Sequence, residues 1–184
     1  FFVLSAYFTD ASVGFYSLTM TMAFRPLNLL SNSVLQVFSQ KIIEKFNHNE
    51  KIHHEVVSLI KNLIKIAIVP TIIVALFSQT LFGFVFGDEW SESGLYLQLL
   101  LPWLFMLFLT APLSFLPELF FKQKKAMTIS LIYFSGRVLA LLSGVYFQSI
   151  FWAVLLFGLV SFVMVSYTLF WYLSLTRKSD SEVQ

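Results

Sequence analysis

Three histidines lie close together in one polar stretch of the sequence, His48, His53 and His54. Neutral imidazoles in such a group can bind a metal ion or titrate near neutral pH. His54-Glu55 also begins as the zinc-protease motif H-E-x-x-H does, but Ser58 stands where the second histidine is required. We therefore interpret the histidines as polar linker residues and expect no metal site.

The rest of the chain lacks the usual combinations of catalytic residues. It has no cysteine, which excludes thiol nucleophiles, disulfides and cysteine-bound zinc. No glycine-rich phosphate loop and no Ser, His and Asp set is recognisable. The net charge of +2 is too small to indicate a nucleic-acid partner. We expect no enzyme and no cofactor.

Charged residues inside apolar stretches are the more informative group. Arg25 is the only charged residue between positions 13 and 38 and precedes Pro26. Its polar neighbours are Thr19, Thr21, Asn28, Ser31, Asn32 and Ser33. A charge near the centre of a bilayer costs about 3 kcal/mol and must face protein or water. Either Arg25 lines a polar cavity, or it pairs with a carboxylate or carbonyl to hold a bundle together.

The candidate cavity-lining or substrate-binding residues are Thr21, Arg25, Asn28, Asn32 and Arg137. Arg137 is the weakest of them, because small residues recur around it at the spacing of close helix packing. Those small residues are Gly136, Ala140, Ser143 and Gly144. We favour packing or snorkelling for Arg137 over a place in the cavity.

The composition indicates that these residues lie in a membrane protein. Of 184 residues, 58% are hydrophobic and 12% are charged, with a mean hydropathy of +0.79. An ordinary soluble domain carries about a quarter charged residues. Several apolar runs are long enough to cross the roughly 30 Å hydrocarbon core as helices. We predict an all-α, polytopic transmembrane helix bundle.

The apolar runs predict about five complete spans, preceded by a partial one at 1–8. The complete spans are 13–38, 62–86, 94–121, 126–147 and 150–175. Pro102, Pro112 and Pro117 should bend the third, and the short connection Gln148-Ser149 makes the last two a tight hairpin. Because the chain opens on Phe1-Phe2 without Met or a basic leader, we expect it to be a fragment of a longer protein.

Basic residues mark every second connection of these spans. Lysines occupy 41–61 and 122–125, and Arg177-Lys178 follow the last span, whereas the other connections have none. Because Lys and Arg concentrate in cytoplasmic loops, this pattern predicts a cytoplasmic C-terminus with a polar tail over 176–184. Residues 41–60 carry apolar side chains at helical spacing, so we expect an amphipathic helix lying on the lipids of the inner leaflet.

The order of sequence features resembles a family of transporters. Val13-Gly14-Phe15-Tyr16-Ser17-Leu18 opens the first complete span, which continues through Pro26-Leu27. The second span runs into Leu81-Phe82-Gly83-Phe84-Val85-Phe86-Gly87-Asp88-Glu89-Trp90, and Leu101-Pro102-Trp103 follow. Nearly the whole chain resembles the C-terminal half of Wzx-like O-antigen and oligosaccharide flippases of the multidrug/oligosaccharidyl-lipid/polysaccharide exporter superfamily. Such proteins often carry a basic residue where this chain has Thr21.

The resemblance implies one lobe of a two-lobed transporter in the bacterial inner membrane. It implies flipping of undecaprenyl-diphosphate-linked oligosaccharides by alternating access, for lipopolysaccharide O-antigen or capsule. The implied partners are the lipid-linked oligosaccharide, membrane lipids, the N-terminal lobe of the same protein and a polysaccharide polymerase.

Three alternatives remain open at this point. A related transporter of the superfamily, a drug exporter or a lipid II flippase, would share the fold and carry another cargo. A membrane-embedded enzyme of envelope assembly would call for a large periplasmic loop or a carboxylate cluster, whereas the expected outward loops are only a few residues long. A membrane scaffold with no transport role is the third.

Overall fold

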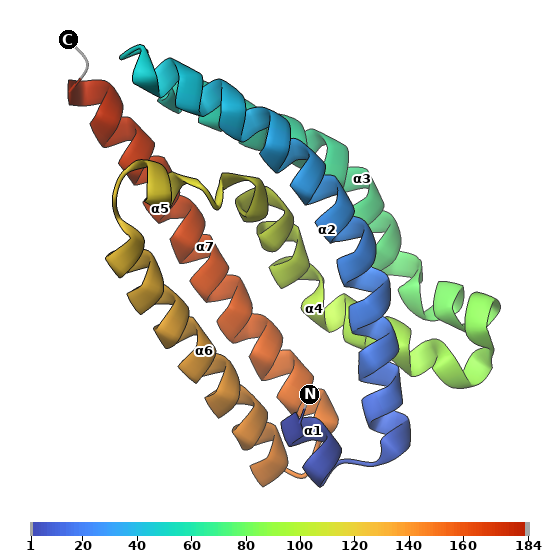
Figure 1. Ribbon diagram of the computed structural model, residues 1–184. Coiled ribbons are helices and arrows are strands. Elements are labelled where there is room, and N and C mark those ends of the chain that lie inside the picture. The colour runs from blue at the N-terminus through green and yellow to red at the C-terminus, as the bar shows by residue number, and fades with distance from the viewer. Residues whose placement is uncertain (1, 183–184) are drawn as a thin grey trace.

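The computed structural model of the protein describes residues 2–182, with side-chain surroundings from Leu4 onward, and the regular secondary structure of this part of the chain is entirely helical (Figure 1). The helices are α1 (Phe2–Tyr7), α2 (Asp10–Asn47), α3 (His53–Phe86), η1 (Asp88–Trp90), α4 (Ser91–Thr110), η2 (Ala111–Leu113), α5 (Leu116–Leu119), α6 (Gln123–Tyr146) and α7 (Ile150–Glu182). Phe1, at the start of the expected partial span, lies outside the described residues.

Four helical stretches of residues 2–182 are long and apolar enough to cross a membrane. They are His53–Phe86, Asp88–Leu119, Gln123–Tyr146 and Ile150–Glu182. The predicted all-α polytopic bundle is therefore confirmed. The expected span 13–38 lies within α2, which has 38 residues but is not among the four, because polar side chains lower its hydropathy. Its crossing of the membrane stays a prediction.

Helix α4 lies at the centre of the bundle, where it packs against α2, α3 and α7 (Figure 1). Trp103, Tyr96 and Leu100 on α4 are almost completely buried. Helix α6 packs on the outer side of α7, and α3 lies on the opposite side of the bundle. Because α3 exposes many large apolar side chains, including Ile66, Leu76 and Phe84, it presents a lipid-facing surface.

Two glycines bring neighbouring helices into close contact. A Cβ atom on Gly94 would lie 2.5 Å from the Cα atom of Gln79 and from the carbonyl oxygen of Ser78. Beside it, the Ser78 hydroxyl donates to the Gly94 carbonyl over 2.9 Å. Gly144 likewise faces Ala153 across the α6–α7 hairpin with no room for a Cβ atom. Such contacts replace the hydrophobic driving force that is missing between helices in lipid.

The expected span 94–121 contains a break. Helix α4 passes through Pro102 but ends at Thr110, and η2 and α5 follow as short turns around Pro112 and Pro117. Each of these two prolines removes a backbone donor just where a helix would continue. The chain then turns back at Phe121, which has a positive φ of 54°, and α6 begins.

Residues 41–60, expected to form a separate interfacial helix, are instead divided between α2 and α3. Helix α2 continues to Asn47, and the chain turns through Asn49, whose φ is 56°. The start of α3 is capped from the far end of the sequence. The Ile52 and His53 backbone N–H groups donate to the two Asp180 carboxylate oxygens of α7, over 2.8 and 3.0 Å. Asp180 lies in the segment 176–184 that was predicted to be a polar tail, and α7 continues through this segment to Glu182.

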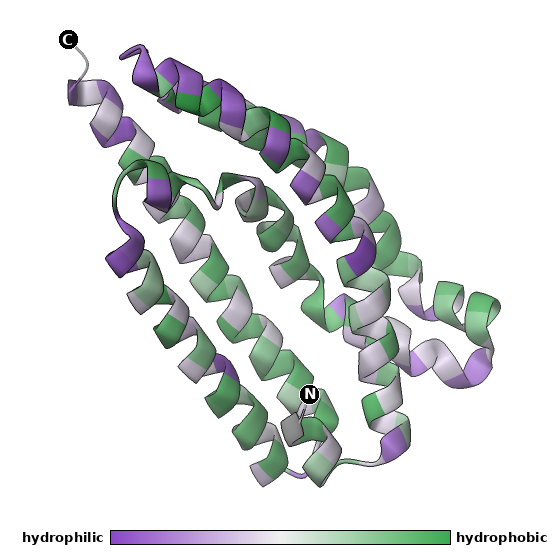
Figure 2. Cartoon of the chain, in the orientation of Figure 1, coloured by the Kyte–Doolittle hydropathy of each residue, from purple (hydrophilic) through white to green (hydrophobic). Residues whose placement is uncertain are grey.

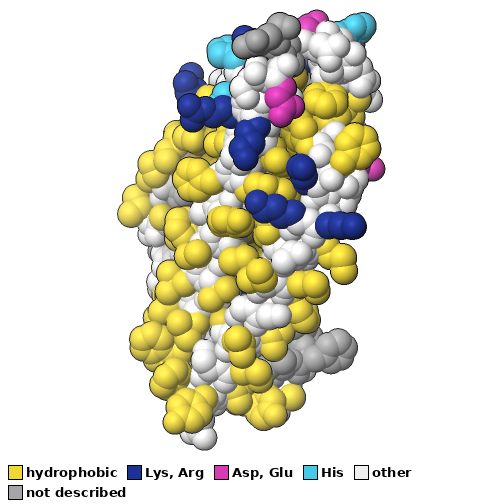
Figure 3. Space-filling view, turned by 90° about the vertical axis from the view of Figure 1, so that its left-hand side faces the viewer, with side chains coloured by type: hydrophobic (Ala, Val, Ile, Leu, Met, Phe, Trp, Pro, Cys, Tyr) yellow, Lys and Arg dark blue, Asp and Glu magenta, His cyan; other side chains and the backbone are white. Residues whose placement is uncertain are grey.

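Polar residues gather at one end of the bundle (Figure 2). This end contains the α2–α3 turn, the end of α7 and the start of α6. The space-filling view shows the lysine and arginine side chains over the same end and mostly hydrophobic side chains below them (Figure 3). This segregation is that expected of a bundle with one end at the lipid headgroups.

We expect Gly94→Ala to destabilise the protein and Gly14→Ala to leave it unchanged or more stable. Both replace glycine inside a helix, where alanine is favoured by about 1 kcal/mol. At Gly94 the added methyl group meets backbone atoms, an overpacking that costs about 1–3 kcal/mol, whereas nothing lies within 4 Å at Gly14. Thermal unfolding in detergent should give a lower midpoint for Gly94→Ala only. Equal midpoints would contradict the close contact.

We also expect Asp180→Asn to loosen the start of α3. An amide has one acceptor oxygen instead of two and no charge, so about 1 kcal/mol of capping energy should be lost. Hydrogen exchange at the Ile52 and His53 amides should accelerate about fivefold. Glu182→Gln, which removes an equal charge from an exposed carboxylate on the same helix, is the control. Similar exchange in both variants would show that Asp180 does not cap α3.

Candidate functional site

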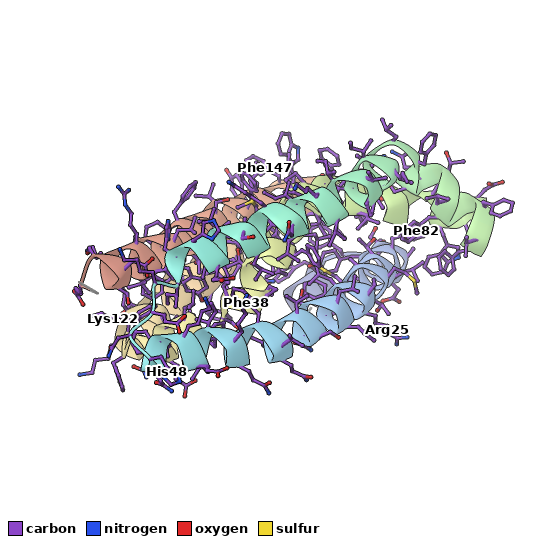
Figure 4. The ribbon with its side chains drawn as sticks, turned by 90° about the horizontal axis from the view of Figure 1, so that it is seen from above. Arg25, Phe38, His48, Phe82, Lys122 and Phe147 are labelled. Atoms are coloured by element: carbon purple, nitrogen blue, oxygen red, sulfur yellow. The ribbon has the colours of Figure 1, made fainter. Side chains whose placement is uncertain are left out.

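Helix α2 carries a row of polar side chains along one face, which we call the polar stripe. Its members are Ser17, Thr21, Arg25, Asn28, Asn32, Gln36 and Ser39. At 100° of rotation per residue they fall within an arc of about 100° and extend for about 33 Å. Four candidate residues predicted from sequence therefore share one face. Figure 4 shows Arg25 on the side of α2 that faces away from the other helices.

The central residues of the polar stripe are open to the surroundings. Arg25, Asn28 and Asn32 are exposed, and Thr21 is partly buried. Within residues 2–182, the Arg25, Asn28 and Asn32 side chains have no hydrogen-bond or ion-pair partner. Arg25 therefore does not hold this bundle together by pairing with a carboxylate of the described chain.

The opposite face of α2 is apolar. Met22, Ala23, Pro26, Leu27 and Leu30 line a groove of about 270 Å³ that continues onto α3 and α4. A hydrogen bond from the buried Thr19 hydroxyl to the Ser93 carbonyl, 2.8 Å long, fixes this side of α2 to α4. Since α2 is held from its apolar side, the polar stripe is turned outward from the bundle.

A cavity of about 360 Å³ lies where α2, α6 and α7 converge on the end of α4. Asn32, an exposed member of the polar stripe, lines it, so at this level the polar stripe borders the cavity as well as the surroundings of the bundle. Further lining residues with polar groups come from α4, α6, α7 and the turn after η2: Thr110, Ser114, Ser130, Tyr133, Thr168, Trp171 and Tyr172. Ser17 and Gln36 could have been found from the helical spacing of the polar stripe. The other lining residues could not, because they belong to segments that meet only in the folded chain.

Arg137 lies apart from the polar stripe, on α6, and is partly buried among aromatic rings. Its guanidinium carbon is 4.2 Å from the ring centroid of Phe157, 5.0 Å from that of Tyr133 and 5.4 Å from that of Trp103. Such cation–π contacts stabilise a charge where water is scarce. Aromatic packing thus holds Arg137 at the side of the cavity that Tyr133 lines. Direct contact with a substrate stays a prediction.

The histidines do not form a common site. The Nδ1 atom of His53 is 2.8 Å from the Thr176 hydroxyl oxygen of α7, whereas His48 and His54 are exposed. His53 therefore has a structural partner beside the Asp180 cap.

These features define a polytopic α-helical membrane protein with one amphipathic helix whose polar face is turned out of the bundle. Residues 1–94, just over half of the chain, match the family described as Polysaccharide biosynthesis protein. The chain belongs to this family. The matched segment contains α1, α2 and α3 and therefore the whole polar stripe, whereas Arg137 lies outside it. Comparisons with curated proteins and with solved structures found no match.

The polar stripe should be accessible to water in the membrane. Because the chain has no cysteine, single replacements provide a clean assay. Asn28→Cys and Asn32→Cys, in the protein in its native membrane, should react with a membrane-impermeant thiol reagent. Leu76→Cys, at a position 67% exposed on the lipid-facing side of α3, should react at least about tenfold more slowly. Equal protection of all three would show that lipid or protein covers the polar stripe.

Proposed function

We propose that the protein flips lipid-linked oligosaccharides, carried on undecaprenyl diphosphate, across the bacterial inner membrane. The units would serve lipopolysaccharide O-antigen or capsule synthesis. Membership of a polysaccharide biosynthesis family supports the pathway, and the polar stripe of α2 supports transport. The proposal is one of transport by alternating access, without catalysis.

The polar stripe carries the argument because of its length and its unpaired groups. At about 33 Å it matches the roughly 30 Å thickness of the hydrocarbon core. Polar and charged side chains facing lipid at that depth are costly, so such residues face a bundle interior or water. A polar surface that reaches from one side of the membrane to the other is what a large hydrophilic headgroup needs in order to cross.

Arg25 gives this surface a fixed positive charge without a protein partner among the described residues. A guanidinium binds diphosphate oxygens through charge-assisted, often bidentate hydrogen bonds. Asn28 and Asn32, one and two turns away on the same face, offer amide donors and acceptors of the kind that bind sugar hydroxyls. We therefore assign Arg25 to the diphosphate and the two asparagines to the sugar unit.

The outward orientation of the polar stripe also bears on which part of the transporter lies opposite it. A lobe whose polar face is turned out of its own bundle requires a second polar surface opposite it. In the proposed transporter this surface belongs to an N-terminal lobe of the same protein, and the two lobes rock around the cargo. The basic end of the bundle, with the C-terminus, would lie in the cytoplasm.

We expect Arg25→Gln in the full-length protein to abolish surface polysaccharide in a flippase-deficient strain, with normal amounts of protein in the membrane. Glutamine keeps the size and polarity of the side chain but removes the charge that binds the diphosphate. Arg25→Lys should retain part of the activity, because a lysine ammonium binds phosphate without the bidentate geometry.

Arg177→Gln provides a matched control, since it removes an exposed arginine from the far end of α7. Polysaccharide should remain at wild-type levels in this variant. Wild-type amounts of surface polysaccharide in the Arg25→Gln variant would contradict a role of the polar stripe in transport. Failure of the unaltered protein to restore surface polysaccharide would indicate another cargo.

A further inference from the structure

The corner between α5 and α6 combines an exposed aromatic ring with three lysines. We call Phe121, Lys122, Lys124 and Lys125 the corner patch. Phe121 is 85% exposed, and the chain turns sharply at its positive φ. The turn is closed by a hydrogen bond from the Lys122 backbone N–H to the Pro117 carbonyl, 2.7 Å long. The prolines that break the third span thus end its passage through the membrane. The turn that follows them exposes the Phe121 side chain.

The lysines of the corner patch are exposed and make no ion pair within residues 2–182. Two acidic groups at this end of the bundle are engaged elsewhere. Asp180 binds the amides of α3, and Glu55 binds Lys41 and Lys45 at distances of 2.7 and 3.1 Å. Glu118 and Glu182 are exposed but lie beyond ion-pair distance of any lysine.

Lys125 is oriented by a ring of the next helix. Its Nζ atom lies 5.1 Å from the Trp171 ring centroid on α7. Trp171 itself is buried, so it fixes the position of Lys125 relative to the bundle. Figure 3 shows lysine and arginine side chains gathered on this face directly above the hydrophobic surface. The positive charge therefore begins where the apolar, membrane-facing surface ends.

Segments that lie at the membrane interface place lysines on the side of the lipid headgroups and residues such as phenylalanine on the apolar side. Phe121 can enter the acyl region beside the bundle, while the neighbouring lysines remain at the phosphates. Unpaired lysines at an anionic surface each favour binding about fivefold, whereas lysines already paired with carboxylates do not. Lys41 and Lys45 are paired in this way, and the corner patch is not.

We propose that the corner patch is a binding site for an anionic phospholipid headgroup of the surrounding bilayer. The lipid phosphate lies among Lys122, Lys124 and Lys125, and its acyl chains lie beside Phe121. This site is separate from the polar stripe and does not depend on the cargo that the protein carries. It anchors the α5–α6 corner at the interface, where the bent third span ends.

The test measures lipid retention by the full chain. The protein is purified in mild detergent, incubated with equimolar phosphatidylglycerol and phosphatidylethanolamine, and the retained lipids are quantified by mass spectrometry. We expect enrichment of phosphatidylglycerol, and a loss of at least about fivefold in this enrichment for Lys122→Gln/Lys124→Gln. Lys41→Gln/Lys45→Gln, which removes the same charge from two lysines that are already paired with Glu55, should retain the enrichment.

Absence of enrichment in the unaltered protein, or equal losses in the two double variants, would overturn the site. A second arm replaces phosphatidylglycerol with undecaprenyl phosphate. Stronger retention of undecaprenyl phosphate, lost in Lys122→Gln/Lys124→Gln, would overturn the assignment to a phospholipid and identify the cargo lipid as the occupant. Circular dichroism of each variant verifies that its helices are intact, so that a loss of bound lipid is attributed to the replaced lysines and not to unfolding.

Discussion

The bilayer makes it costly for a helix to expose charge and hydrogen-bonding side chains to hydrocarbon, and the arrangement of this protein follows from that constraint. Helices α3, α6 and α7 satisfy it by being apolar on their outer faces. Helix α2 does not, because one of its faces is polar over about 33 Å. It is a stable part of a membrane bundle only if that face meets water or another polar surface. The functional proposal rests on this requirement.

The packing of α2 explains why its polar face is turned outward. An apolar face with Pro26 and Leu27 lies toward α4 and the groove beside α3, and the hydrogen bond from Thr19 to Ser93 fixes it there. Any rotation of α2 that buried Arg25 would break this bond and bring a charge against apolar side chains. The close contacts at Gly94 and Gly144 hold the other helices in the positions against which α2 packs.

Hydropathy and turn residues predicted much of this architecture. The apolar runs of α3, α6 and α7 stand out because each is long enough to cross hydrocarbon. Pro112 and Pro117 marked the break after α4, since proline removes a backbone donor wherever it stands. The common face of Thr21, Arg25, Asn28 and Asn32 also follows from spacing alone, because an α-helix repeats every 3.6 residues.

Other features depend on segments that meet only in the folded chain. The periodic apolar residues of 41–60 suggested one interfacial helix, but the turn at Asn49 and the cap from Asp180, 128 residues away from Ile52, divide them between two helices. The cavity lined by Asn32 and the aromatic surroundings of Arg137 likewise draw on helices far apart in sequence. The sequence by itself determined the all-helical membrane fold and the polar stripe, because burial in lipid and helical periodicity act locally along the chain. Only the tertiary structure decided that the polar stripe is turned outward and which aromatic rings surround Arg137, because both depend on which helices lie side by side.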